Sequence, residues 1–377
     1  MTGPLSGVRV IEIGSIGPGP FTAMMLADMG ADVVRLERGG GQALGSGAWN
    51  LTLRGRPSVA VNLKRPAAIE LVLEMCEQAD VLIEGFRPGV MERLGLGPDA
   101  ALARNPKLVY GRMTGYGQDG PMADVAGHDI NYISIAGALG AIAREGERPL
   151  FPLNLVGDYG GGGMLLAFGV VCALLEARSS GQGQVVDAAM VDGTAILTTL
   201  MHGMRSIGAW RDTAGTNMLD SGAPFYEVYE TADGRYFSIG AIEPQFYVKL
   251  LELLEIPVEE FPQLDGERWP ALRARFTEVF MTKTRDQWTA LLEPVDACAT
   301  PVLGLGEAPG HRHNVERKVF VEHHGVSQPA PAPRFSRTVP ELTTPARDPG
   351  ADTDEALSAW GVPADRLNAL REAGAIG

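Results

Sequence analysis

The sequence has 377 residues, a formal net charge of −14 at pH 7, 45% hydrophobic residues and 21% charged residues. A chain of this length exceeds the usual size of one hydrophobic core, so we expect two domains of an ordinary soluble globular protein. The acidic balance argues against nucleic acid and anionic membranes as general partners, because both require a broad basic surface.

The first 190 residues alternate strand-like and helix-like stretches, which is typical of a parallel sheet covered by helices. Residues 8–13 and 31–36 are predicted as buried strands, and the helical spacing of residues 21–29 lies between them. Gly30 is placed to end that helix as a C-cap. Further strands are predicted over residues 58–63, 80–84 and 108–113, and a helix is predicted over residues 67–78.

The pattern changes after about residue 193. A long helix is predicted over residues 194–210 and is followed by a polar stretch to residue 222. Residues 225–230 and 235–239 predict a β-hairpin, because the Asp233-Gly234 pair between them favours a tight turn. Further helices are predicted over residues 245–254, 271–282 and 285–292.

The C-terminal part is simpler. Residues 327–349 are rich in proline and predict an extended connector, and residues 354–373 predict two helices broken at 361–363. The sequence therefore predicts one Rossmann-like α/β domain, one smaller α+β domain and linkers between them.

The three cysteines, Cys76, Cys172 and Cys298, are far apart and include no C-x-x-C pair. We expect buried thiols in a reducing compartment, with neither a zinc site nor a disulfide. The first residues lack the features of a signal peptide, and no apolar run is expected to span a bilayer. These observations predict a cytoplasmic protein.

Residues 14–20, GSIGPGP, lie between a strand and a helix, where a dinucleotide-binding fingerprint would occur. The third glycine of that fingerprint is replaced by Thr22, and Pro18 and Pro20 remove two amide donors from the loop. We therefore predict a tight βα turn rather than an NAD or FAD site. A turn shaped for another nucleotide stays open.

Basic residues gather near predicted strand ends, where open α/β sheets bind ligands. Coenzyme A carries a 3′-phosphate and a pyrophosphate and would need such charges. The group comprises Arg38, Arg54, Arg56, Lys64, Arg87 and Arg93. From it we predict four coenzyme A contacts, Arg38, Lys64, Arg87 and Arg93.

Two polar clusters carry most of the functional signal, residues 127–132 (GHDINY) and residues 154–159 (NLVGDY). His128 lies at a predicted loop-to-helix junction, and Asp158 lies before a glycine-rich helix start as a predicted N-cap. The glycines suggest close approach of a ligand to the backbone, and the amides there could stabilise an oxyanion. The simpler interpretations are a capping or core histidine and a routine N-cap aspartate.

Glu243 ends the hairpin segment just before Pro244 opens a helix. Taken alone it is an ordinary polar edge residue. In contact with His128 it would orient the imidazole and stabilise the imidazolium.

Several motifs occur together in order, at residues 4–10 (PLSGVRV), 30–34 (GADVV), 84–90 (EGFRPGV), 112–118 (RMTGYGQ) and 183–187 (GQVVD). Over nearly its whole length the chain resembles the family III CoA-transferases of the CaiB/BaiF type. The GHDINY segment, Asp158 and Glu243 resemble the racemase members of that superfamily. The resemblance implies that His128, with Glu243, and Asp158 are two bases that flank the α-carbon of an acyl-CoA thioester. Asp129, Asn154 and Tyr226 would support them.

The implied enzyme is an isomerase that racemises 2-methylacyl-CoA thioesters at C2 by two-base proton transfer through an enolate. It would need no metal and no cofactor, because coenzyme A enters as part of the substrate. The main alternative is a CoA transferase that forms an acyl-anhydride at Asp158. A CoA-binding protein without catalytic activity is a third possibility, and an NAD-dependent enzyme is the weakest.

The resemblance also implies an interlocked homodimer. The large, CoA-binding domain would combine residues 1–190 and 331–377, and the small α+β domain would span 226–312. Residues 191–225 and 313–330 would be linkers. The active site would lie between the large domain of one subunit and the small domain of the other, so that His128 and Glu243 meet across subunits. We expect neither nucleic acid nor a membrane as a partner.

Overall fold

The computed structural model describes residues 2–40, 47 and 49–377. The chain divides into two compact units. Unit 1 comprises Met1–Ala136, Pro152–Thr198 and Lys318–Gly377, and unit 2 comprises Gly137–Phe151 and Thr199–Arg317. The predicted domain limits stay a prediction.

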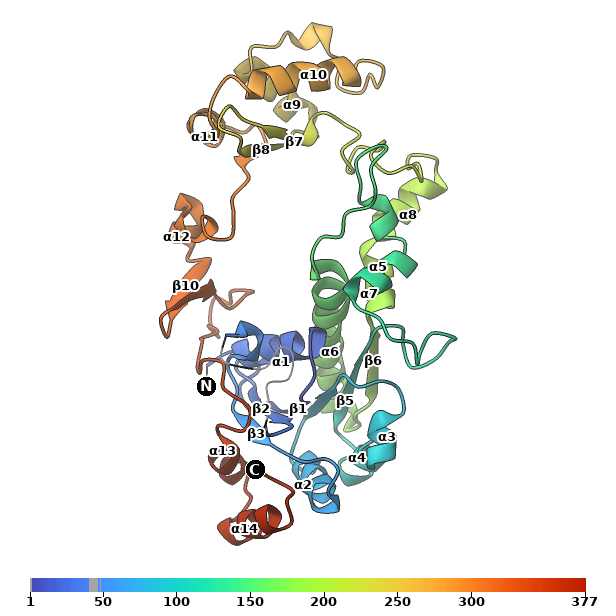
Figure 1. Ribbon diagram of the computed structural model, residues 1–377, viewed down its shortest axis with the longest axis vertical. Coiled ribbons are helices and arrows are strands. Elements are labelled where there is room, and N and C mark those ends of the chain that lie inside the picture. The colour runs from blue at the N-terminus through green and yellow to red at the C-terminus, as the bar shows by residue number, and fades with distance from the viewer. Residues whose placement is uncertain (1, 41–46, 48) are drawn as a thin grey trace. The chain divides into compact units, whose positions relative to one another are not determined.

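Unit 1 is built on a six-stranded parallel sheet in the order β3-β2-β1-β4-β5-β6 (Figure 1). This is the strand order of a doubly wound nucleotide-binding fold, and it confirms the predicted Rossmann-like α/β architecture. The strands are β1 (Arg9–Ile13), β2 (Asp32–Glu37), β3 (Ser58–Ala60), β4 (Val81–Glu84), β5 (Val109–Thr114) and β6 (Val185–Ala189).

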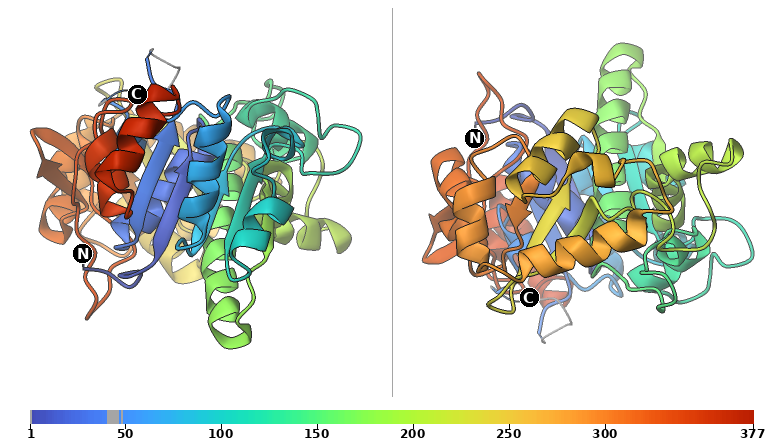
Figure 2. Two further views of the ribbon diagram at one scale, coloured as in Figure 1. Left: turned by 90° about the horizontal axis from the view of Figure 1, so that it is seen from below. Right: turned by 90° about the horizontal axis from the view of Figure 1, so that it is seen from above.

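Helices cover both faces of this sheet (Figure 2). Successive side chains of a strand point to opposite faces, so the apolar residues on each face need a covering layer. Ile11 and Val34 pack in a core with residues of α2, α4, α13 and α14, whereas Val10 and Val33 pack in a second core with α1 and α6. The helices of unit 1 are α1 (Pro18–Asp28), α2 (Pro66–Cys76), α3 (Val90–Leu94), α4 (Pro98–Arg104), α5 (Asp129–Ile135), α6 (Leu165–Ser180), α7 (Met190–Leu197), α13 (Thr353–Ala359) and α14 (Ala364–Glu372).

Two predicted segments differ from the structure. The single helix predicted over residues 194–210 is wrong, because α7 ends at Leu197 and α8 (Thr199–Ser206) begins two residues later. The hydroxyl of the β-branched Thr198 donates to the Ala195 carbonyl at 2.9 Å and competes with the helical ladder. The predicted connector 327–349 is wrong at its start, where β11 (Val326–Pro329) pairs antiparallel with β10 (Phe320–His323).

A buried ion network joins the first strands of unit 1. The carboxylate of Glu12, which is fully buried, contacts Nη1 of Arg35 at 2.6 Å and Nε of Arg56 at 2.5 Å. Arg54 pairs with Asp28 at 2.6 Å. Buried charges are retained when they are paired and hydrogen-bonded, so these arginines have structural partners. The expectation that Arg54 and Arg56 belong to a ligand-binding basic group is therefore wrong.

Unit 2 contains a three-stranded antiparallel sheet in the order β7-β8-β9. The predicted hairpin is confirmed, and Gly234 in its turn has a φ of +69°, a conformation that favours glycine. Phe237, Phe276 and Trp288 are fully buried in the core of this unit. The remaining elements are β7 (Tyr226–Glu230), β8 (Tyr236–Gly240), β9 (Ala299–Pro301), α9 (Pro244–Leu253), α10 (Trp269–Phe280), α11 (Arg285–Leu292) and α12 (Arg312–Arg317).

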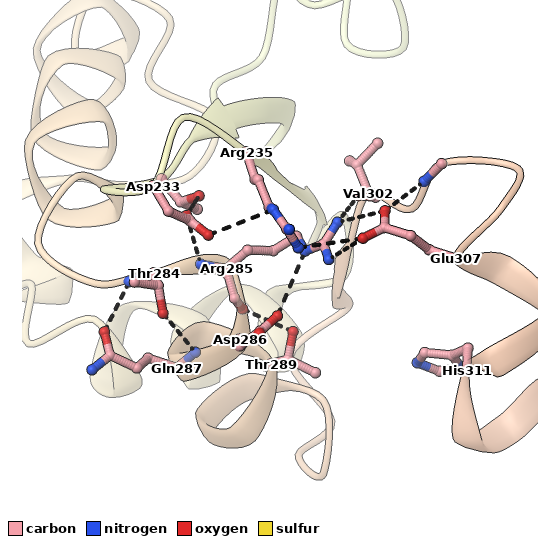
Figure 3. Close-up of polar contacts among 12 residues, drawn as sticks. Asp233, Arg235, Thr284, Arg285, Asp286, Gln287, Thr289, Val302, Glu307 and His311 are labelled. Atoms are coloured by element: carbon pink, nitrogen blue, oxygen red, sulfur yellow. Dashed lines mark hydrogen bonds and ion pairs between the residues drawn. The ribbon is translucent and has the colours of Figure 1, made fainter.

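A polar network fixes the chain that leaves this sheet (Figure 3). The Arg285 guanidinium makes two contacts with Glu307, at 2.7 and 2.9 Å, and also donates to the Val302 carbonyl at 3.0 Å. Arg235 contacts Glu307 at 3.3 Å, and the Arg285 amide donates to Asp233 at 3.0 Å. The start of α11, the hairpin turn and the segment after β9 are thus tied together.

The three cysteines are free thiols in the described part of the chain, but only Cys76 is buried. The prediction of buried thiols is wrong for Cys172, on an exposed face of α6, and for Cys298, in the loop before β9. Cys172 occurs in an apolar stretch and Cys298 lies between two alanines, and neither sequence context reveals which face of the helix or loop meets solvent.

The apolar stretch Leu155–Ser180 corrects the expectation that no segment could span a bilayer. By length and composition alone this 26-residue helical stretch, which contains an 18-residue window with a mean hydropathy of 1.7, could cross a membrane. Half of that window is buried inside the protein, and the core helix of a globular fold passes the same test.

Candidate active site

Asp158 lies within a π-helical segment, η3 (Leu155–Met164), which continues directly into α6. The prediction that Asp158 caps a helix is wrong, because the N-cap is Asn154. The side-chain amide of Asn154 donates to Oδ2 of Asp158 at 3.1 Å. π-Helical segments are rare and frequently occur at functional sites, which fits a carboxyl group that must be aimed in one direction.

The glycine tract after Asp158 lets η3 approach its neighbours closely. A Cβ atom on Gly161 would lie 2.7 Å from the Thr194 amide nitrogen in α7, and one on Gly163 would lie 2.6 Å from the Phe21 ring in α1. Both glycines are buried. The expectation that the tract admits a ligand is therefore wrong for these two, since they pack against protein.

The backbone amide of Asp158 is already occupied. It donates to Oδ2 of Asp129 at 2.7 Å. Asp129 is the first residue of α5 and is 5% exposed. The idea that the Asp158 amide itself stabilises an oxyanion is therefore corrected, because this donor has a carboxylate partner within the protein.

His128 is the N-cap of α5, which places it at a loop-to-helix junction as predicted. Its amide donates to Oδ1 of Asn131 at 3.0 Å, so the backbone at this position is fixed, while the side chain is exposed. In unit 1, His128 at the start of α5 is therefore adjacent in sequence to Asp129, whose carboxylate accepts the hydrogen bond from the Asp158 amide.

The surroundings of Asp158 favour its protonated form. Burial raises the pKa of the Asp158 carboxyl group, and the negative charge of Asp129 raises it further. The hydrogen bond from Asn154 and the positive charge of a protonated His128 oppose this rise, but burial is the largest effect. A raised pKa suits a carboxyl group that delivers a proton, and His128 is close enough for its charge to act on Asp158.

The turn after β1 lies against the Asp158 carboxyl group. Gly17 has a φ of +74°, and a Cβ atom built there would lie 3.3 Å from Oδ2 of Asp158. The loop after β4 meets the same turn, since a Cβ atom on Gly85 would lie 2.9 Å from Oγ of Ser15. Asp158 is therefore next to the point where the strand order reverses, between β1 and β4, where such sheets bind ligands. Sequence reasoning treated Gly17 only as a turn residue.

The predicted coenzyme A contacts all lie in unit 1 and are exposed, as phosphate contacts must be. They are Arg38, Lys64, Arg87 and Arg93. Glu84, at the end of β4, accepts a hydrogen bond from the Phe86 amide at 2.7 Å and so fixes the loop that carries Arg87. Their role as coenzyme contacts stays a prediction.

Glu243 and Tyr226 belong to unit 2 and lie at one end of its hairpin. Glu243 is the exposed N-cap of α9, and Tyr226 lies opposite Gly240 in the β7–β8 register. The side-chain amide of Gln263 donates to the carbonyls of Ala241 and Ile242, at 3.0 and 2.7 Å, and holds the loop before Glu243. A partnership of Glu243 with His128 stays a prediction.

Residues 5–354 match the model of CoA-transferase family III. The chain is 46% identical to alpha-methylacyl-CoA racemase of Mus musculus, with 96% of this chain and 95% of that protein covered. It is 43% identical to alpha-methylacyl-CoA racemase of Homo sapiens, with 97% and 96% covered. Among solved structures it is similar to a CAIB/BAIF family protein from Brucella suis, with a TM-score of 0.83, 23% identity and 96% and 100% covered. The last likeness supports the fold alone.

Proposed function

The chain belongs to CoA-transferase family III, and we propose that it is an isomerase that racemises 2-methylacyl-CoA thioesters at C2. The observation that carries this function is the similarity to the mouse and human racemases over nearly the whole chain. The site in unit 1 supports it, because a two-base reaction can use a histidine together with a half-buried carboxyl group whose pKa is raised.

The reaction moves one proton away from the α-carbon and returns another to the opposite face. The neutral imidazole of His128 takes the proton from one enantiomer, and the C–H electron pair moves into the thioester as an enolate. Protonated Asp158 then delivers a proton to the other face, and the reverse reaction exchanges the two roles. A positioned acid or base typically contributes about 10²- to 10⁴-fold in rate. No resident metal or redox cofactor enters these steps.

The substrate is an acyl-CoA thioester. Its phosphates are assigned to Arg38, Lys64, Arg87 and Arg93, which are exposed and lie in the unit that holds Asp158. Charge-assisted hydrogen bonds from arginine and lysine suit phosphate oxygens. Asn154 supports the reaction by donating to the Asp158 carboxyl group at 3.1 Å.

A homodimer accounts for an exposed apolar stripe along η3 and α6. Met164, Phe168, Val171 and Leu175 follow one another at helical spacing and are 53, 67, 42 and 69% exposed. Apolar residues in such a row on a helix surface indicate a partner. We assign this face to a second copy of the chain, interlocked with the first, which brings its Glu243 to His128.

The test is α-proton exchange in D₂O with the purified protein and separate (2R)- and (2S)-2-methylacyl-CoA. We expect deuterium incorporation together with interconversion of the enantiomers. Asp158→Asn should abolish interconversion, while His128 still exchanges the proton of the one enantiomer that it faces. His202→Ala, which changes an exposed histidine of α8, serves as the control.

Two outcomes would overturn the proposal. No exchange with either enantiomer, but transfer of CoA to an added carboxylic acid, would make the protein a transferase with Asp158 as its nucleophile. Exchange of both enantiomers by the Asp158→Asn variant, with interconversion retained, would remove Asp158 from the reaction.

A further inference from the structure

The two carboxylate oxygens of Asp129 are in different situations. Oδ2 accepts the Asp158 amide at 2.7 Å, whereas Oδ1 is buried and has no hydrogen-bond partner among residues 2–40, 47 and 49–377. A buried carboxylate oxygen without a donor costs free energy, and few native structures retain such a group without a reason. Asp129 is therefore a candidate for a role beyond holding the start of α5.

The geometry keeps Asp129 directly on the backbone of η3. A Cβ atom on Gly157 would lie 2.7 Å from Oδ2 of Asp129, so the glycine is what allows the carboxylate to reach the Asp158 amide. The contact joins residues that are 29 positions apart in the sequence. It fixes the peptide that carries the Asp158 side chain.

The other charged residues on the elements packed against η3 are either paired with another residue or exposed to solvent. Within the described part of the chain, the charges that act on the pKa of Asp158 are those of Asp129 and His128. Asp28 of α1 is paired with Arg54, and Arg112 of β5 is paired with Glu84 and Glu92. The exposed charged residues of the remaining elements are Glu176, Arg178, Asp187 and Asp192.

We propose that Asp129 is a positioning residue for the general acid, which it holds through the Asp158 amide and to which it presents a neighbouring carboxylate. The inference rests on the proposed racemase function, since it deepens the role of Asp158 there. A general acid is useful only if it holds its proton while the partner base is neutral. Burial begins this effect, and the charge of Asp129 adds to it.

The first test separates charge from hydrogen bonding. Asp129→Asn keeps an oxygen that accepts the Asp158 amide but removes the charge. We expect the acidic limb of the pH profile of kcat/KM to move to lower pH, because the Asp158 pKa falls. Asp124→Asn removes an equal charge from an exposed loop of the same unit and should leave the profile in place. An unmoved acidic limb in a folded Asp129→Asn protein would overturn the proposal.

The second test needs no substrate, so it distinguishes this inference from the function itself. Carbodiimide labels protonated carboxyl groups, and peptide mass spectrometry reads the labelling of Asp158 across pH. In the wild-type protein its midpoint should lie above the usual aspartate range, and in Asp129→Asn or the smaller Asp129→Ser it should fall. A wild-type midpoint at the usual value would overturn the proposal even if the protein is a racemase. If racemisation is absent but the midpoint is raised, the proposed function fails while the Asp129–Asp158 coupling stands.

Discussion

Gly193→Ala tests whether close helix packing sets the position of Asp158. A Cβ atom on Gly193 in α7 would lie 1.8 Å from the carbonyl oxygen of Gly161 in η3 and 2.5 Å from its carbon, against 3.4 Å for an ordinary contact. Both contacts are with backbone, which cannot rotate away as a side chain can. The two helical segments must therefore separate by about 1.5 Å or distort.

The magnitude follows from two opposing effects. Overpacking a well-packed core costs about 1–3 kcal/mol, and a clash with backbone belongs at the upper end of this range. Alanine offsets about 1 kcal/mol of the cost, because it favours a helix interior over glycine. We expect a net loss of about 2 kcal/mol in the free energy of unfolding. Gly203→Ala is the matched control, since a Cβ atom on this glycine of α8 meets nothing within 4 Å. It should gain up to about 1 kcal/mol.

The assay combines stability with turnover. Urea unfolding gives the two changes in stability, and hydrogen–deuterium exchange locates the weakened amides, which should lie in η3, α6 and α7 of unit 1. Because η3 carries Asp158, a shift of about 1 Å should lower kcat by up to about 10²-fold. A Gly193→Ala protein as stable and as active as the wild type would refute the view that the glycine tract exists for helix packing.

Three further predictions follow from named contacts. If each site joins two subunits, co-expressed His128→Ala and Glu243→Gln chains should recover up to about a quarter of wild-type activity, because each mixed dimer then holds one intact site. Mixtures that are as inactive as the single variants would exclude a shared site. The Arg285 hydrogen bonds hold the pKa of Glu307 at about 2, below its usual value, so this pairing stabilises the protein above about pH 4.5 and loses its effect as the pH falls toward 2. The difference in thermal midpoint between wild type and Glu307→Gln should therefore shrink over that window, and a constant difference would contradict it. In the proposed homodimer, Phe168→Asp should shift the mass in analytical ultracentrifugation toward monomer, because this exposed apolar residue is 67% accessible; an unchanged mass would place the interface elsewhere.

The sheet of unit 1 could be predicted from the sequence because its strands are buried on both faces. Parallel strands of this kind read as continuous apolar runs, such as the one that includes Val10 and Ile11, and the turn residues between them mark their ends. The hairpin in unit 2 could also be predicted from the sequence, because its turn requires a positive φ and Gly234 adopts one. These signals depend only on neighbouring residues in the sequence, so they can be recognised without knowledge of the fold.

The errors concern contacts between distant residues. Arg56 looks like a solvated phosphate ligand in the sequence, but its partner Glu12 lies 44 positions away. The amide of Asp158 looks free until α5 is placed beside η3 and Asp129 reaches it. The glycines after Asp158 allow either a ligand or a helix at close range, and only the positions of Thr194 and Phe21 decide between them.

The surroundings of Asp158 bear on which reaction of its family this carboxyl group performs. A nucleophile that forms an acyl-anhydride must be ionised and must keep a free oxygen, whereas a general acid must hold a proton at the pH of the reaction. Burial and the charge of Asp129 both raise the Asp158 pKa, and Asn154 donates to Oδ2 at 3.1 Å. The raised pKa enlarges the protonated fraction of the carboxyl group at a given pH, whereas the hydrogen bond from Asn154 lowers the pKa and engages one carboxylate oxygen. Partial burial beside Asp129 therefore suits a carboxyl group that holds and delivers a proton, in keeping with the similarity to the mouse and human racemases.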